Sequence, residues 1–204
     1  MRTITVVDED PPWPAAFETL RASVWPLVSD LAVTIEHVGS ASVPGLAAKP
    51  VIDLDVVVRS GEDVPTAIEF LATLGYAHLG DLGIDGREGL ASPPGTPDHN
   101  LYVCPPDSLG LANHLALRDH LRRHPERAAE GGALKRRIER ANLRWEETRA
   151  HRGGLGRRPG SSREFDRGLR AIGMAALADA ARGFMAARPP PPRSLRPGSS
   201  PGAP

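Results

Sequence analysis

The sequence predicts an α+β fold, a mixed β-sheet with flanking helices that is followed by a helical C-terminal part. Short β-branched segments alternate with amphipathic segments up to about residue 104, and from Asp107 onward the apolar spacing is helical. Charge divides at nearly the same place: residues 1–110 hold 16 acidic and 5 basic side chains, and residues 111–204 hold 9 and 20. The net charge of zero therefore combines an acidic half with a basic half.

Apolar spacing and turn residues define the expected elements in order. Strands are expected at residues 3–7, 32–38 and 51–58, with shorter strands near 76–79, 84–90 and 100–104. Helices are expected from Pro14 to about Ser29 and over residues 64–74, 107–123, 125–149 and 165–185. These elements predict a main domain at residues 1–150 and a C-terminal helical extension at residues 151–188. Residues 189–204, with 7 prolines, are expected to form a disordered tail.

Composition excludes several classes of protein. No apolar run reaches the roughly 18–20 residues that a transmembrane helix needs. The first eight residues are too short and too soon acidic for a secretory signal, and one cysteine, Cys104, excludes a disulfide framework and a multi-cysteine zinc site. The low aromatic content argues against a stacking platform for single-stranded nucleic acid. We therefore expect a soluble, cytoplasmic protein with no membrane contact.

The strand expected at residues 51–58 contains two acidic residues, Asp53 and Asp55, in an otherwise apolar run. Residues at i and i+2 of a strand share one face, which places the two carboxylates about 6.5–7 Å apart along the chain. Two ionised carboxylates this close need a compensating charge, and a divalent cation such as Mg²⁺ is the usual one. The alternative is that both acids lie at a frayed strand end that faces water.

A second signal lies just upstream, where the strand expected at residues 32–38 ends in Gly39-Ser40. Glycine permits close backbone approach, and exposed N–H groups at such a turn can bind a phosphate together with the serine hydroxyl. The segment does not have the spacing of a Walker P-loop, and no GxGxxG motif occurs. A Gly-Ser turn alone is a weak signal, but the acid pair 13 and 15 residues after Ser40 strengthens it considerably.

Together these residues resemble a known family. A strand ending in Gly-Ser and followed by Asp-x-Asp in an apolar strand resembles the nucleotidyltransferase superfamily, and residues 36–53 resemble the hallmark of its GrpB family. Further similarity occurs at residues 10–17, 118–125 and 134–135, so that the resemblance covers roughly residues 3–150. It implies a minimal nucleotidyltransferase-like fold. Because some members are fused to dephospho-CoA kinase, it also suggests a link to coenzyme A metabolism by analogy.

The resemblance implies metal-assisted transfer of a nucleotidyl group from a nucleoside triphosphate to a small-molecule acceptor. Asp53 and Asp55 would be catalytic and would hold Mg²⁺ or Mn²⁺, with Asp98 as a candidate third carboxylate. The phosphates would be bound by Gly39, Ser40 and Lys49. Substrate-binding candidates are His37, Arg87, His99, Arg118 and Arg122.

Plainer roles are open for most of these candidates. Lys49 could extend along the surface at a strand start, Arg118 and Arg122 could form a solvated helix face, and His37 and His99 could be core histidines. The sequence also departs from the family pattern, because the family's usual His-His-Leu-His-Val strand reads His99-Asn100-Leu101-Tyr102-Val103 here.

Two other functions therefore remain as hypotheses. That altered strand favours a catalytically silent nucleotide- or metabolite-binding module on the same fold. A nucleic-acid binder using the arginine-rich residues 107–150 is disfavoured, because residues 118–152 interleave 11 basic with 6 acidic side chains.

Overall fold

A computed structural model describes residues 5–8 and 12–152 of the chain. The expected helix at residues 165–185, the Pro-rich tail and all but the first two residues of the expected extension lie outside the described residues. Within them, no helix is long and apolar enough to cross a bilayer.

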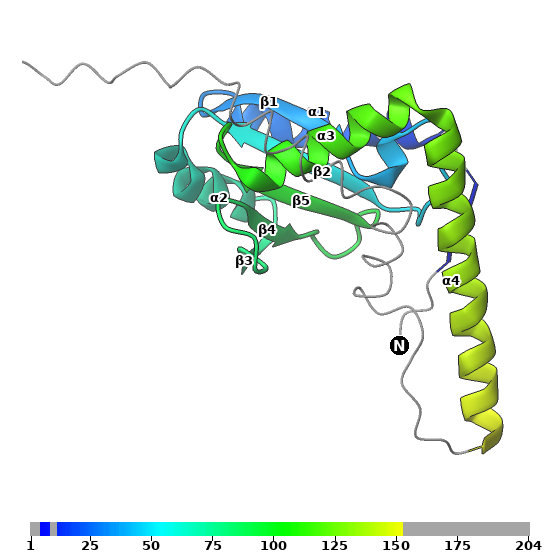
Figure 1. The fold of residues 1–204 in the computed structure, drawn as a ribbon. Coiled ribbons are helices and arrows are strands. Elements are labelled where there is room, and N and C mark those ends of the chain that lie inside the picture. The colour runs from blue at the N-terminus through cyan, green and yellow to red at the C-terminus, as the bar shows by residue number, and fades with distance from the viewer. Residues whose placement is uncertain (1–4, 9–11, 153–204) are drawn as a thin grey trace, which may run out of the picture.

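The architecture is α+β, as predicted, and is built on one five-stranded mixed sheet (Figure 1). The strands are β1 (Ala32–Val38), β2 (Ile52–Val58), β3 (Ala77–Gly80), β4 (Glu88–Ala91) and β5 (His99–Cys104), in the order β1-β2-β5-β4-β3. Strand β2 pairs antiparallel with β1 and parallel with β5, whereas β4 pairs antiparallel with both β5 and β3. The chain therefore places β2, with its two aspartates, inside the sheet rather than at an edge.

In the part of the chain that the structure describes, four helices flank the sheet: α1 (Pro12–Val28), α2 (Val64–Ala72), α3 (Leu109–Arg123) and α4 (Pro125–Arg152). A short 3₁₀ turn, η1 (Ser40–Ser42), joins β1 to the segment before β2, and a second, η2 (Gly61–Asp63), precedes α2. Helices α1 and α2 lie on one side of the sheet, α3 crosses the other side, and α4 runs on past the sheet as a long helix (Figure 1). The sheet thus has one apolar face and one face that α3 covers.

Side-chain alternation along β2 and β5 separates these two faces. Leu54, Val56, Leu101 and Val103 are fully buried in the main core with residues of α1 and α2. The intervening Val57, Cys104 and the α3 residue Leu111 form a separate small cluster on the other face. The polar residues of β2 belong to this second face, which is why a mostly apolar strand can contain two aspartates without disrupting the main core.

The expected elements agree with the structure to within a few residues, with two differences. Of the strand expected at residues 3–7, the described part contributes only an isolated bridge between Val7 and Ala48. The strand expected at residues 84–90 begins only at Glu88, because positive φ angles at Gly80, Gly83 and Gly86 turn the preceding segment. Short strands among glycines are the elements that apolar patterning predicts least well.

His37, a candidate substrate-binding residue, follows Glu36 in β1 and so points to the opposite face of the sheet. Its ring stacks on Phe17 of α1, with ring centroids 4.5 Å apart and the planes 5° from parallel. Burial, assisted by the charges of Arg122 and Arg118, lowers the pKa of His37 from 6.5 to about 4. His37 is therefore a neutral ring packed on the α1 side of the sheet.

This packing predicts a pH dependence of stability. The unfolded chain takes up a proton at His37 near pH 6.5, whereas the folded protein does so only near pH 4, so the free energy of unfolding decreases as the pH falls through that window. Replacing His37 with Phe keeps a stacked ring that cannot titrate. Urea denaturation at pH 7, 5.5 and 4.5 is expected to show a shallower pH dependence for His37→Phe than for the wild type. Parallel curves would contradict this assignment.

Candidate functional site

Two carboxylates occupy the centre of the face that α3 covers. The sheet register places Asp53 beside Asn100 of β5, and Asp55 between Glu36 of β1 and Tyr102 of β5. Asn100 Nδ2 donates a hydrogen bond to Asp53 Oδ1 at 2.7 Å. Burial raises the pKa of the Asp53 carboxyl, and the hydrogen bond from Asn100 opposes that shift.

Asp55 is completely buried, and a histidine of α3 supplies the hydrogen-bond partner of one of its oxygens. His114 Nδ1 lies 2.8 Å from Asp55 Oδ2, while Asp55 Oδ1 has no hydrogen-bond partner. The other ring nitrogen of His114, Nε2, lies 3.3 Å from the Arg87 guanidinium. Because a guanidinium can only donate, Nε2 accepts, and the proton of the neutral ring is therefore assigned to Nδ1, from which it is donated to Asp55.

Arg87 completes this buried network. The residue is only 7% exposed, and its guanidinium carbon lies 4.4 Å from the centre of the Tyr102 ring. Its Nε has no partner in the structure. The network Asp55–His114–Arg87 therefore links the centre of β2 to the segment before β4, with α3 between them.

The Gly39–Ser40 turn packs directly against the first aspartate. Gly39 has a φ of +70°, and a Cβ added there would lie 2.7 Å from Asp53 Cγ and closer still to Asp53 Oδ2. Ser42 Oγ donates a hydrogen bond of 2.7 Å to the carbonyl of Gly39 and closes the turn. Only glycine satisfies both the backbone angle and the contact, so the turn and the carboxylate form one unit.

A lysine of α4 reaches the same turn. Lys135 of α4 donates a hydrogen bond from Nζ to Ser40 Oγ. Burial lowers the pKa of Lys135 to about 8, the charge of Asp53 opposes the shift and the charge of Lys49 adds to it. Lys49 is exposed and acts on Lys135 only through its charge. The turn thus combines a hydroxyl and one amine beside a carboxylate.

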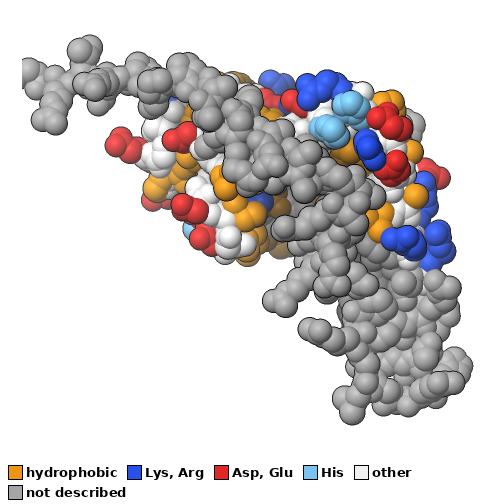
Figure 2. Space-filling model, in the orientation of Figure 1, with side chains coloured by type: hydrophobic (Ala, Val, Ile, Leu, Met, Phe, Trp, Pro, Cys, Tyr) orange, Lys and Arg blue, Asp and Glu red, His pale blue; other side chains and the backbone are white. Residues whose placement is uncertain are grey.

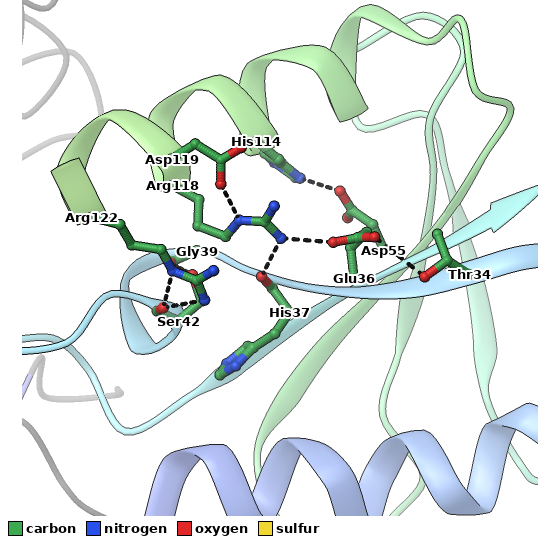
Figure 3. A network of polar contacts seen from close by, with 10 residues as sticks. All are labelled: Thr34, Glu36, His37, Gly39, Ser42, Asp55, His114, Arg118, Asp119 and Arg122. Atoms are coloured by element: carbon green, nitrogen blue, oxygen red, sulfur yellow. Dashed lines mark hydrogen bonds and ion pairs between the residues drawn. The ribbon is translucent and has the colours of Figure 1, made fainter.

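The two candidate arginines of α3 bind the protein itself, as Figure 3 shows. Arg118 donates to the Glu36 carboxylate at 2.7 Å, to the His37 carbonyl at 3.1 Å and to Asp119 at 2.8 Å. Arg122 donates twice to the Ser42 carbonyl, at 3.0 and 2.7 Å. Both side chains therefore fasten α3 to β1 and η1.

Three other candidates lie apart from this face. His37 packs on Phe17, as described above, and His99 bonds to the Tyr76 hydroxyl and the Pro97 carbonyl, each at 2.7 Å, with its side chain buried. Asp98 lies in an exposed bend before β5. Within residues 5–8 and 12–152, no group of three or more His, Cys, Asp or Glu side chains is arranged to hold a metal ion, so Asp98 does not complete a three-carboxylate site.

Sequence reasoning missed His114 and the contact made by Lys135. His114 lies one turn before Arg118 on the same side of α3, so the spacing of Arg118 and Arg122 extended back by four residues leads to it (Figure 3). Lys135 is one of two lysines among 25 basic residues, which is itself a signal. Asn100 and Tyr102, the two positions that depart from the family pattern, are those that lie beside Asp53 and Asp55.

Comparisons with known proteins agree with this fold. The model of the family described as "GrpB protein" matches residues 3–151. The chain is similar to the UPF0157 protein YqkA of Bacillus subtilis, with 30% identity over 137 residues that cover 67% of this chain and 40% of that protein. A dephospho-CoA kinase of Mycolicibacterium paratuberculosis is 32% identical over 85 residues, which cover 40% of this chain and 21% of the kinase.

Among solved structures, the crystal structure of conserved protein GrpB from Enterococcus faecalis matches with a TM-score of 0.68 and 27% identity, covering 86% of this chain and 99% of that one. The chain belongs to the GrpB family, which is nucleotidyltransferase-like.

The Gly39 contact makes a testable prediction, and Gly45 provides a matched control. Both glycines have positive φ, but a Cβ at Gly45 meets nothing within 4 Å. Gly45→Ala is expected to lower the free energy of unfolding by about 1–2 kcal/mol, through backbone strain alone. Gly39→Ala adds the collision with Asp53 and is expected to lower the free energy of unfolding by about 1–3 kcal/mol more. Urea denaturation of both variants measures the difference, and equal losses would contradict the close approach.

The surroundings of Lys135 predict an unusual titration. Reductive ¹³C-methylation labels only Lys49, Lys135 and the N-terminus, and a Lys135→Arg variant assigns the signal of Lys135. By NMR we expect Lys135 to titrate near pH 8, and lower in Asp53→Asn, because the lost carboxylate no longer favours the charged amine. Titration near the ordinary lysine value of 10.5, unchanged by Asp53→Asn, would contradict the described packing.

Proposed function

We propose that the chain binds a nucleoside triphosphate at the Gly39–Ser40 turn and transfers its nucleotidyl group to a small-molecule acceptor. The supporting observation is the direct packing of this turn against Asp53, with Lys135 bonded to Ser40. A glycine turn with a hydroxyl and an amine suits phosphate oxygens. A phosphate beside a carboxylate is repelled unless a cation lies between them, so the adjacency favours a metal–polyphosphate complex over a bare anion.

The residues present suit a two-carboxylate metal site. Mg²⁺ and Mn²⁺ prefer oxygen ligands, and Mg²⁺ is commonly held by one or two carboxylates plus substrate phosphates. Asp55 offers a buried oxygen, Oδ1, that has no protein partner, and Asp53 lies two residues away on the same face. When bound, the cation would neutralise the phosphates and orient them.

The chain's own residues would prepare this arrangement. Asn100 holds one oxygen of Asp53, and His114 holds one oxygen of Asp55, which leaves Asp55 Oδ1 without a protein partner and available to a ligand. Gly39 allows the turn to approach the carboxylate closely enough for one ligand to reach both. Arg118 and Arg122 would act indirectly, by holding β1 and η1 in place.

A catalytically silent nucleotide- or metabolite-binding module is the second candidate. It is favoured by the lack of a three-carboxylate group among the described residues. The exposed basic surface at the α3–α4 junction interleaves its positive charges with acidic partners such as Glu126 and Glu130, which does not favour a nucleic-acid ligand (Figure 2). The dephospho-CoA kinase relative suggests an acceptor connected with coenzyme A metabolism. A cytoplasmic location is part of the same proposal.

The test is ligand-dependent thermal stability. With Mg²⁺ or Mn²⁺ and a nucleoside triphosphate at 100 times its Kd, the melting temperature of the wild type is expected to rise by about 5–10 °C, since such binding is worth about 2.7 kcal/mol. Asp53→Asn is expected to abolish the rise. Glu69→Gln, on the exposed side of α2, is expected to retain it and serves as the charge-matched control.

The outcomes separate the candidates. Pyrophosphate release in acceptor screens by the wild type, lost in Asp53→Asn, supports transfer. Binding without release under all acceptors supports the silent module. If none of the four nucleoside triphosphates stabilises the protein in a metal-dependent way, the proposal is wrong.

A further inference from the structure

We infer that Lys135 is the cationic half of a binding site for the terminal phosphates of a polyphosphate at the Gly39–Ser40 turn. This inference rests on the proposed function and identifies how its phosphate site is built. It assigns a ligand-binding role to a residue of α4, the helix furthest along the described chain.

The packing of α4 against the segment before β2 determines where Lys135 lies. Ala128 of α4 packs with Val43 and Leu46 in a small buried cluster. One turn further on, Gly132 lies so close to Ala47 that an added Cβ would be 3.3 Å from the Ala47 Cβ and 3.4 Å from its backbone nitrogen. This close approach at residues 128–132 brings Lys135, about one turn later, to the Ser40 hydroxyl. The packing of α4 therefore sets the position of Lys135.

Lys135 lies in an environment that disfavours its charge: it is largely buried, and Lys49 is near enough to add repulsion. Asp53 is the acidic side chain that opposes this effect. An anion at the turn would relieve the repulsion between the two amines and replace the water that burial removes from Lys135.

The neighbouring arginines are already engaged within the protein and are not the main phosphate ligands. Arg118 and Arg122 already donate to Glu36, Asp119 and the backbone of residues 37 and 42. Lys135, one of two lysines in an otherwise arginine-based sequence, instead donates to Ser40 at the turn. An ammonium is a compact charge with freely directed donors, which suits the oxygens of a flexible polyphosphate tail.

The carboxylate of Asp53 limits the class of ligand that can bind at the turn. Asp53, beside the same turn, repels a simple anion such as a single carboxylate or sulfate. A polyphosphate can bind because it brings several oxygens and its own divalent cation, which offsets Asp53. Inorganic tripolyphosphate with Mg²⁺ is therefore the simplest probe, since it contains the phosphate chain without a base or a sugar.

The experiment is calorimetric titration of the full chain with Mg²⁺–tripolyphosphate at pH 7. Lys135→Gln is expected to weaken affinity about ten- to a hundredfold, the range of a hydrogen bond to a charged group. Lys135→Arg, which retains the charge, is expected to lose less. Arg137→Gln removes the same charge from an exposed position two residues along α4 and is expected to bind as the wild type does. Melting temperatures check that each variant is folded.

A measurement on the wild type makes the test independent of any loss of fold. Tripolyphosphate is expected to shift the ¹³C-methyl signal of Lys135 in the methylated protein. If the wild type binds tripolyphosphate or a nucleoside triphosphate but the Lys135 signal and the affinity of Lys135→Gln are unchanged, this inference is wrong and the proposed function stands. If the wild type binds neither, both are wrong.

Discussion

The burial of one carboxylate organises the α3 side of this molecule. Asp55 has no exposure to solvent and lies inside a five-stranded sheet, where an uncompensated charge is strongly unfavourable. The His114 ring satisfies one of its oxygens, and His114 can do so only if α3 crosses this face of the sheet. With α3 in place, Arg118 and Arg122 fasten it to β1 and to the turn after β1. The position of Gly39 and Ser40 thus follows from how Asp55 is accommodated.

Asp53 differs from Asp55 in its exposure to solvent and in its neighbours. Asp53 is partly exposed, is held by Asn100, and contacts the backbone of Gly39 so closely that no other residue fits there. Lys135 reaches the same turn from α4. Elements far apart in the sequence therefore meet around one carboxylate: the Gly39–Ser40 turn, the Lys135 amine and, two residues along β2, Asp55 with its unpaired oxygen. A metal-bound polyphosphate is the ligand that we propose for this arrangement.

Much of the fold was predictable because its elements have strong local signals. Strand β1 was predicted with its observed limits, and β2, α2 and α3 within two residues, since apolar periodicity and flanking turns define them. The shared face of Asp53 and Asp55 and the turn at Gly39 follow from the same local reasoning. Local reasoning could not predict the faces of the sheet on which His37 and His99 lie, because these depend on the register between strands and on which face α1 covers. His114 and Lys135 were missed because their partners lie 59 and 95 residues away, and the local signals at these two positions do not indicate which residues they contact.

The most direct test of this account is a crystal structure of the protein with Mn²⁺ and a non-hydrolysable nucleoside triphosphate, with the metal located by its anomalous scattering. The account predicts a manganese peak at the carboxylates of Asp53 and Asp55, and terminal phosphates within hydrogen-bonding distance of Ser40 and Lys135. A nucleotide bound elsewhere on the protein, or at the turn with no metal at the aspartates, would contradict it.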